Sequence, residues 1–283
     1  MANAGLGFRN RFISGVTLSG GSWLAALPLA NALTTDRAEV ARSTNALAAS
    51  TQFDVDFGVA VAIRAVHLAA HNCSQTATWR VTLGTAAGLS DIADSTGQAV
   101  WYLPFMAPAP EEWETNNWWG LQQDEYMGHP FGATILFSSS FNARYMHIAI
   151  TDTTNAAGYV QLGRVWAGDV FIPVVNHDFG SRHGHKDKSQ RVETLGGGFQ
   201  SEKLRRQRTS QIMLSGLTDN EGAWVHEINR RAGTVEEILY LPDVADYTAC
   251  QRYGFIGVLD TLSPLSQDKP SRNSVGFQLT EWL

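Results

Sequence analysis

The chain has 283 residues with a net charge of −6, charged residues make up 17% of it, and it contains nine Trp. This length suits one or two domains, and low charge with many aromatic residues favours a mainly β protein. The acidic balance excludes a general affinity for nucleic acid, and the lack of an 18-residue apolar run excludes a transmembrane helix. The first residues lack the apolar run of a signal peptide, so we expect the chain to be made and folded in a cytoplasm.

Strand patterns fill the first 172 residues. In residues 51–58, TQFDVDFG, Phe53, Val55 and Phe57 alternate with acidic residues, which is the period of a half-buried strand. Residues 61–72 form a longer apolar run, typical of a central strand. Further strand-like runs separated by turn residues lie at 12–20, 78–84, 133–140, 144–152 and 158–168. Many short strands separated by turns predict an N-terminal jelly-roll β-sandwich over residues 1–172.

The charge pattern changes after this sandwich. All four Lys follow residue 175, whereas residues 1–174 contain eight Arg and no Lys, and we place a linker at 173–190. Residues 191–283 predict a smaller C-terminal α+β split barrel, with strands at 208–217, 236–243, 253–265 and 274–283. Its one helix, about 218–232, begins with the capping box T-D-N-E and is followed by a Gly at the capping position.

Four short motifs follow one another in the first domain: His71-Asn72, Thr78 to Val81, Ala143 to His147, and Leu162 to Gly168. In this order they resemble the galactose-binding-like (discoidin-type) jelly roll over residues 20–172. The resemblance implies the sandwich fold. It leaves the ligand open, because this fold hosts carbohydrate binding, lipid binding and pure scaffolding.

The second domain carries its own series of matching runs: Arg208 to Leu217, Thr218 to Glu221, Thr234 to Asp243, Tyr253 to Leu262, and Ser274 to Trp282. Together they resemble the ring-forming barrel of the distal tail proteins of tailed phages. That family usually has the barrel before the sugar-binding module, whereas here the sandwich comes first. A strand added to the barrel by residues 1–18 restores part of the usual topology.

Residues 177–188, HDFGSRHGHKDK, are rich in histidine and raise the question of a metal site. A zinc ion needs three or four ligands, and no HExxH motif or nearby Cys accompanies His183 and His185. These two residues also lie between Arg182 and Lys186, and nearby cations disfavour a dication. We therefore expect no metal and no cofactor, and interpret the stretch as a polar segment that lies against a neighbouring subunit. A metal-dependent hydrolase is the alternative.

No catalytic constellation can be assembled from the spacing of nucleophiles and bases. His67 and His147 fall in apolar runs, where we expect core histidines. Glu111 and Glu112 are adjacent, so on a strand they point in opposite directions. We also expect Cys73 and Cys250 to be buried, reduced thiols. The sequence predicts a protein that is not an enzyme.

Two stretches are candidate contact surfaces. Residues 202–208, EKLRRQR, form the densest basic run and lack the interleaved aromatic residues of single-strand nucleic-acid sites, which favours salt bridges between subunits. The candidate intersubunit residues are His183, His185, Lys186, Lys188, Arg205, Arg206 and Arg208. Residues 111–128 supply aromatic and amide side chains for a glycan or protein contact, namely Trp113, Asn116, Asn117, Trp118 and Trp119.

The resemblance of the second domain implies a structural virion protein of a tailed phage. We expect copies to form a ring at the distal tail tip or baseplate and to connect the tail tube to hub, tip or fibre proteins. The resemblance implies six copies, with a trimer as the other possibility. The alternative function is carbohydrate binding, in which the jelly roll attaches the tail to a glycan on the host surface.

Overall fold

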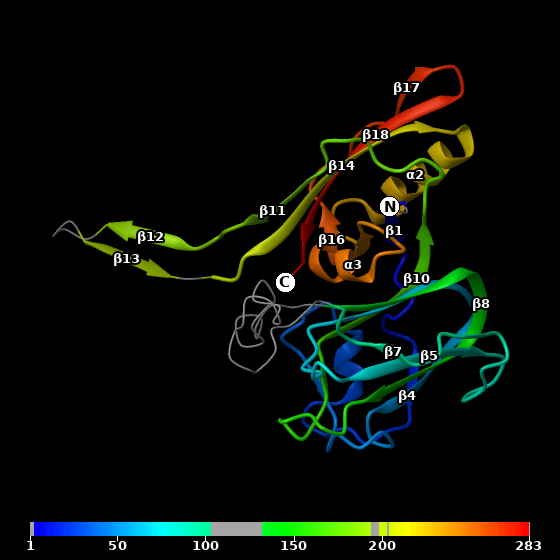
Figure 1. Ribbon diagram of the computed structural model, residues 1–283, viewed down its shortest axis with the longest axis vertical. Coiled ribbons are helices and arrows are strands. Elements are labelled where there is room, and N and C mark those ends of the chain that lie inside the picture. Colours follow the sequence, from blue (N-terminus) through cyan, green and yellow to red (C-terminus); the bar gives the residue numbers. More distant parts are fainter. Residues whose placement is uncertain (1–2, 103–131, 194–197, 203, 283) are drawn as a thin grey trace, which may run out of the picture.

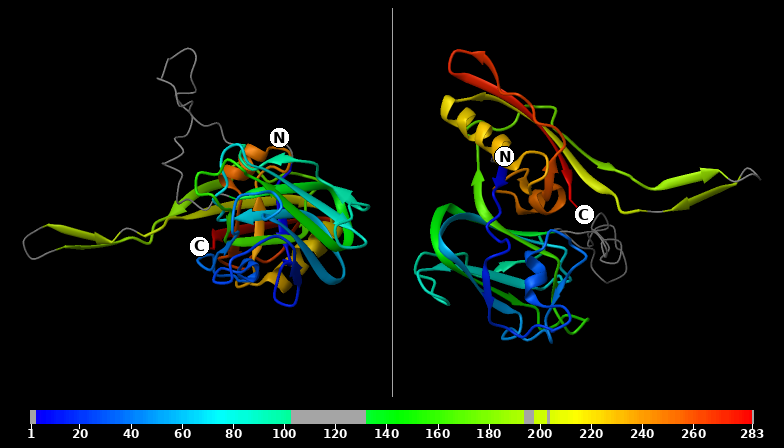
Figure 2. Two further views of the ribbon diagram at one scale, coloured as in Figure 1. Left: turned by 90° about the horizontal axis from the view of Figure 1, so that it is seen from below. Right: turned by 180° about the vertical axis from the view of Figure 1, so that it is seen from behind.

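The computed structural model describes residues 3–102, 132–193, 198–202 and 204–282. Within them the chain is mainly β, as predicted, and fourteen strands join one large antiparallel sheet. The sheet passes through two stacked units, and a long arm projects to one side (Figures 1 and 2).

The first unit is built on four long antiparallel strands in the order β10-β4-β8-β5. These are β10 (Arg164–Phe171), β4 (Gln52–Ala69), β8 (Ala133–Thr151) and β5 (Thr78–Gly84). Side chains from all four strands line one apolar core, together with short flanking segments. The shorter elements of this unit are β2 (Thr17–Ser19), the 3-10 helix η1 (Leu29–Leu33), β3 (Ala41–Arg42), β6 (Ala93–Asp94), β7 (Gln98–Ala99) and β9 (Gln161–Leu162).

In two places, a pair of neighbouring predicted strands forms one continuous strand in the structure. The runs at 51–58 and 61–72 are both parts of β4, and those at 133–140 and 144–152 are both parts of β8. The register of β4 against β8 shifts between Asp56 and Val61, around Gly58, which has a φ of 76°. From the sequence, a glycine between two apolar runs indicates a turn. Here the strand continues past Gly58, with a local irregularity in its pairing.

The second unit places two helices against strands β15 (Ile238–Leu241), β16 (Phe255–Leu259), β18 (Arg272–Glu281) and β14 (Gln207–Leu217). The predicted helix is confirmed as α2 (Asp219–Ala232). Thr218 and Glu221 form its capping box, and Gly233 caps its end with a φ of 54°. The helix α3 (Tyr247–Tyr253), capped by Asp246, was not predicted. Strand β17 (Ser266–Lys269) pairs with β18.

The N-terminal strand β1 (Gly5–Phe8) joins the two units into one sheet. One edge of β1 pairs with β10 of the sandwich and the other with β15 of the second unit, which confirms that residues 1–18 contribute a strand there. A Cβ atom on Gly7 would lie 2.5 Å from the ring of buried Trp166. A larger residue is therefore excluded by close packing of the backbone on that ring.

The segment predicted as a linker, 173–190, is partly ordered into the sheet. Asn3 donates to the carbonyls of Pro173 and Val174, and β11 (Arg182–Lys186) pairs with β14. Beyond β11 the chain runs out through β12 (Gln190–Glu193) and returns through β13 (Phe199–Glu202). We call residues 182–211, the projecting ribbon in Figures 1 and 2, the arm.

Candidate functional site

The arm is a two-stranded ribbon with little of its own surface buried. Every residue of β11 and β12 is exposed, as is every residue of β13. Apolar side chains are among them: Val192 is 62% and Phe199 66% exposed. Because its strands are exposed, no other described part of this chain covers the ribbon. An isolated two-stranded hairpin is marginally stable in water, so such strands normally have a packing partner.

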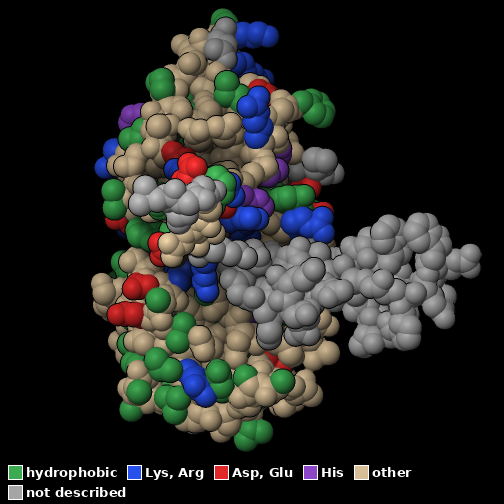
Figure 3. Space-filling model, turned by 90° about the vertical axis from the view of Figure 1, so that its left-hand side faces the viewer, with side chains coloured by type: hydrophobic (Ala, Val, Ile, Leu, Met, Phe, Trp, Pro, Cys, Tyr) green, Lys and Arg blue, Asp and Glu red, His purple; other side chains and the backbone are tan. Residues whose placement is uncertain are grey.

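The arm is also strongly basic. It contains eight Lys and Arg against three Asp and Glu, which gives it a net charge of +5 in a chain of net charge −6. Arg206 forms an exposed ion pair with Asp187 at 3.3 Å, and the guanidinium of Arg191 lies 5.4 Å from the ring centroid of Phe199. Lys and Arg side chains are visible at mid-height in the view from the side on which the arm projects (Figure 3).

The predicted intersubunit residues separate into two groups. His185, Lys186, Lys188, Arg205 and Arg206 are on the exposed part of the arm. Arg208 instead lies at its root, where it forms an internal ion pair with Glu281 at 2.7 Å. His183, also at the root, stacks on Tyr253 of its own chain with ring centroids 4.9 Å apart. Burial, followed by the nearby charge of His177, lowers the pKa of His183.

The histidine-rich stretch forms no metal site in the described part of the chain. No group of three or more His, Cys, Asp or Glu there is arranged to hold an ion. His183 and His185 are alternate residues of one strand separated by Gly184.

No described helix is long and apolar enough to span a membrane.

Two buried arginine clusters fix the junction of the units. In the first, Arg164 of β10 donates to both carboxylate oxygens of Glu237, at 3.0 and 2.7 Å, and Asn10 donates to the same carboxylate. In the second, Glu281 pairs with Arg208 and with Arg37, which also donates to the carbonyl of Ile256. Burial, partly offset by Glu281, lowers the pKa of Arg37 to about 10.

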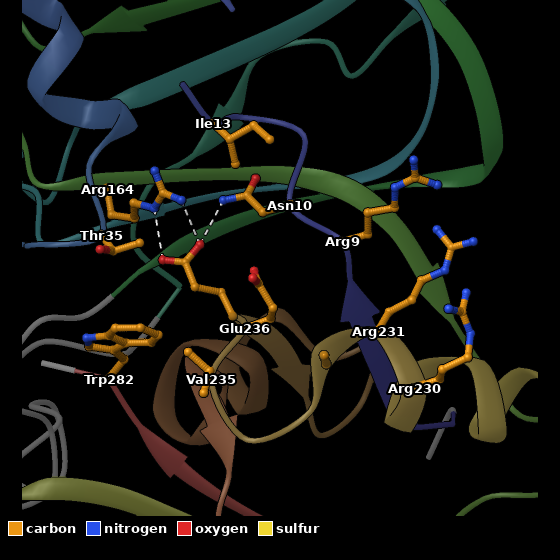
Figure 4. Close-up of a pocket in the computed structure, with 12 residues that line it drawn as sticks. Arg9, Asn10, Ile13, Thr35, Arg164, Arg230, Arg231, Val235, Glu236 and Trp282 are labelled. Carbon is orange, nitrogen blue, oxygen red and sulfur yellow. Dashed lines mark hydrogen bonds and ion pairs between the residues drawn. The ribbon is translucent and has the colours of Figure 1, made fainter. Parts of the chain in front are cut away.

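A cavity of about 610 Å³ lies against this junction. Figure 4 shows Arg9, Arg230 and Arg231 at one end and Thr35 and Trp282 at the other. The described residues that line it include no Ser, Cys, His or Lys, and the carboxylate of Glu237 is occupied by Arg164 and Asn10. The hydroxyl of Thr35 and the carboxylate of Glu236 also line the cavity.

The histidines considered as bases differ in environment. His67 is a core residue as predicted: it is buried, pairs with the hydroxyl of Thr134 at 2.8 Å, and burial lowers its pKa well below the usual value. The core position predicted for His147 is wrong, because this half-buried residue contacts Asp54 at 2.8 Å. Both cysteines are buried free thiols, as predicted.

The predicted glycan or protein contact lies outside the described residues. It comprises Trp113, Asn116, Asn117, Trp118 and Trp119. Two of the junction arginines, Arg37 and Arg164, were by contrast not predicted from the sequence, whereas Arg208 was predicted as an intersubunit contact. A usable signal was present for Arg164, which interrupts the apolar run LGRVWAG and so indicates a buried charge that needs a partner.

No family model matches this sequence, and no curated protein matches it. Similar solved structures include the family 32 carbohydrate-binding module from C. perfringens NanJ in complex with galactose, at 14% identity and a TM-score of 0.36. Others are CBM32-1 from a family 31 glycoside hydrolase of Clostridium perfringens (12%, 0.33) and the lectin domain of lectinolysin complexed with Lewis B antigen (15%, 0.36). The match to the NanJ module covers 59% of this chain and 99% of that module. The match to CBM32-1 covers 55% and 95%, and the match to the lectin domain 57% and 96%, respectively. They are carbohydrate-binding domains of the jelly-roll type, and TM-scores this low leave the function of this chain to be inferred from its own residues.

Proposed function

We propose that this chain is a non-enzymatic assembly subunit whose arm joins it to further copies of itself. The observation that carries the proposal is the arm, a ribbon exposed on both faces that presents Val192 and Phe199 to solvent. Folding alone does not bury these side chains, whereas association with another chain does. The basic charge of the arm suits an acidic partner, and the rest of this chain has a net charge of −11.

The assembly we propose is a ring in the virion of a tailed phage, at the distal tail tip or baseplate. The order of elements in the second unit supports it, since strand β14 and helix α2 are followed by β15, β16 and β18 as in the resembling ring-forming barrel, with α3 and β17 as additional elements. Strand β1 adds the N-terminal strand that this topology needs. Ring closure requires two different complementary faces on each subunit, and a projecting arm supplies one of them. The other partners we propose are the tail tube, hub and fibre proteins, with six copies in the ring by resemblance or three.

Removal of the arm tests this function. Lys186 and Gln207 are cross-strand partners, so a two-residue Asn-Gly turn that joins them replaces residues 187–206 without opening the sheet. We expect the intact chain to sediment as an oligomer and the shortened chain as a monomer with an unchanged urea midpoint. The proposal is wrong if the intact chain is monomeric at every concentration, or if the shortened chain forms the same oligomer.

A second candidate function is carbohydrate binding by the sandwich unit, for attachment to a host-surface glycan. The antiparallel sheet of β10, β4, β8 and β5 with its apolar core supports it, because the sequence resemblance of residues 20–172 implies an antiparallel β fold. Carbohydrate binding is also the activity described for the similar solved domains. The binding groups we propose are Trp113, Trp118 and Trp119 with Asn116 and Asn117, since aromatic faces stack on sugar rings. Titration with galactose and other monosaccharides, followed by nuclear magnetic resonance, tests it. Saturable binding that Trp118→Ala abolishes supports this function, and no binding to any sugar contradicts it.

A further inference from the structure

The cavity at the junction of the two units has an arginine-rich end. A second hollow of about 300 Å³ adjoins the cavity of about 610 Å³, and Arg9 and Arg231 line both. Arg230 also lines the larger one and Arg11 the smaller. Figure 4 shows the side chains of Arg9, Arg230 and Arg231 gathered at this end. The four arginines come from two distant parts of the chain, the segment after β1 and the last turn of α2.

The backbone around Asn10 holds two of these arginines in place. The buried side chain of Asn10 donates to Glu237 at 2.9 Å and accepts from the backbone N–H of Ala167 at 3.0 Å. The N–H of Arg11 donates to the carbonyl of Ala167 at 2.7 Å. Arg9 has a φ of 65°, a left-handed conformation that costs free energy in a residue with a Cβ atom. Strained backbone of this kind gathers at binding sites, where the surrounding structure holds it.

Two of the four arginines have no carboxylate partner in the described part of the chain. Arg230 and Arg231 share Glu227 of their own helix, whereas Arg9 and Arg11 form no ion pair there. Burial, followed by the nearby charges of Arg9 and Arg231, lowers the pKa of Arg11. The guanidinium groups are therefore close enough to repel one another, and an anion bound among them relieves this repulsion.

Carboxylates also line the two hollows, so the balance of charge decides what binds. Glu237 is already paired with Arg164, and Asp169 and Glu236 are the other acids apart from the one shared within α2. Over both hollows the lining includes five Arg and four Asp or Glu, a net charge of +1 in a chain of net charge −6. The arginine end thus attracts an anion, while the acids and the hydroxyl of Thr35 accept hydrogen bonds from hydroxyl groups.

The shape of the site separates phosphate from other anions. One arginine satisfies a planar carboxylate through two parallel hydrogen bonds, whereas several arginines around one point suit the three charged oxygens of a phosphate. A cavity of about 610 Å³ is also far larger than a phosphate ion and falls within the range of about 300–1,000 Å³ for small-molecule sites. Its remaining wall includes the side chains of Ile13, Val235 and Trp282.

We propose that this cavity binds the phosphate monoester of a small hydroxylated molecule, such as a sugar phosphate. The phosphate lies among the four guanidinium groups, and the rest of the molecule extends along Thr35 and Glu236 toward Trp282. Strand β1, which leads directly to Arg9, pairs with both units, and α2 belongs to the second, so the ligand bridges the junction. This inference goes beyond the proposed assembly function and does not depend on the arm.

Calorimetric titration of the full chain at constant ionic strength tests the site. The probes are inorganic phosphate, glucose 6-phosphate, glucuronate and glucose. We expect saturable binding of phosphate, tighter binding of glucose 6-phosphate, weaker binding of glucuronate than of glucose 6-phosphate, and no binding of glucose. The R9Q/R231Q variant removes charge-assisted hydrogen bonds and is expected to weaken binding of glucose 6-phosphate at least about tenfold.

Two further variants separate binding from folding. Arg9→Gly is expected to be at least as stable in urea as the wild-type chain, because glycine adopts the left-handed conformation without strain, and yet to bind glucose 6-phosphate at least about tenfold more weakly. The matched control R252Q/K269Q removes two exposed cations elsewhere and is expected to bind like the wild-type chain.

The inference is overturned if neither phosphate probe binds saturably, or if glucose or glucuronate binds as tightly as glucose 6-phosphate. It is also overturned if R9Q/R231Q or Arg9→Gly binds glucose 6-phosphate like the wild-type chain, or if R252Q/K269Q loses binding as strongly as R9Q/R231Q. These results concern the cavity alone. The assembly function is tested separately by the oligomer and its loss on removal of the arm.

Discussion

Replacement of Glu281 by Ala is expected to be the most destabilising single change at the junction of the two units. The carboxylate is 1% exposed and accepts from the backbone N–H and the guanidinium of Arg208, at 2.7 to 3.0 Å. It also lies 3.5 Å from the guanidinium of Arg37, whose side chain is 7% exposed. The Ala variant leaves the buried guanidinium of Arg37 and the partly buried guanidinium of Arg208 without their shared carboxylate.

Removal of one partner from a buried ion pair costs about 3–5 kcal/mol, because the remaining charge is left without compensation. Since domains of this kind are stable by only about 5–15 kcal/mol, Glu281→Ala removes a large share of the total. Glu281→Gln keeps the shape and part of the hydrogen bonding, so we expect a smaller loss. The matched control is Glu227→Ala, which breaks ion pairs to the exposed Arg230 and Arg231 and is expected to change stability little.

Urea unfolding followed by tryptophan fluorescence measures these differences as shifts of the midpoint at constant slope. A loss of less than about 1 kcal/mol for Glu281→Ala, or one no larger than that of Glu227→Ala, contradicts this prediction. Such a result means that water or other groups compensate the two arginines. The junction is then not held by this carboxylate.

Three further predictions concern packing, pH and the arm. Gly7→Ala is expected to lower the free energy of unfolding in urea by about 1–3 kcal/mol, because its Cβ would lie 2.5 Å from Trp166. Gly97 has open space around its Cβ position, so an equal loss for Gly97→Ala contradicts this reason. Burial lowers the pKa of His71 in the folded chain to about 4. As the pH falls, the unfolded chain therefore binds a proton at His71 before the folded chain does, and the free energy of unfolding decreases between about pH 6.5 and about pH 4. His71→Gln is expected to make the urea midpoint depend less on pH over this range. If the midpoint of the variant changes with pH as much as that of the wild-type chain, His71 is not the group responsible. Phe199→Ser is expected to leave the midpoint within about 0.5 kcal/mol of wild type while it weakens association, and sedimentation of the variant as a wild-type oligomer contradicts that role.

The sequence predicted elements that have a buried face or a defined cap. Phe53 and Val55, alternating with acids, are buried on β4, and the Thr218 capping box begins α2 as expected. Strands β12 and β13 were missed because a ribbon exposed on both sides has no apolar period to detect. Their discovery required the backbone pairing of residues 190–193 with 199–202.

The site was harder to predict than the fold. The sequence predicts intersubunit contacts for the basic run at 202–208, but Arg208 within it is held by Glu281, 73 residues away in the chain. Arg37 and Glu281 are separated even further, and spacing carries no information about such a contact. Buried ion pairs between distant elements depend on how the units pack, which local patterns do not encode.

Light scattering over a range of concentrations measures the mass of the 283-residue chain in solution and so tests whether it assembles. We predict a closed oligomer, at three or six times the chain mass of 30.9 kDa, which dissociates at high salt as the charges on the arm are screened. A mass equal to one chain at all concentrations and at low salt contradicts it.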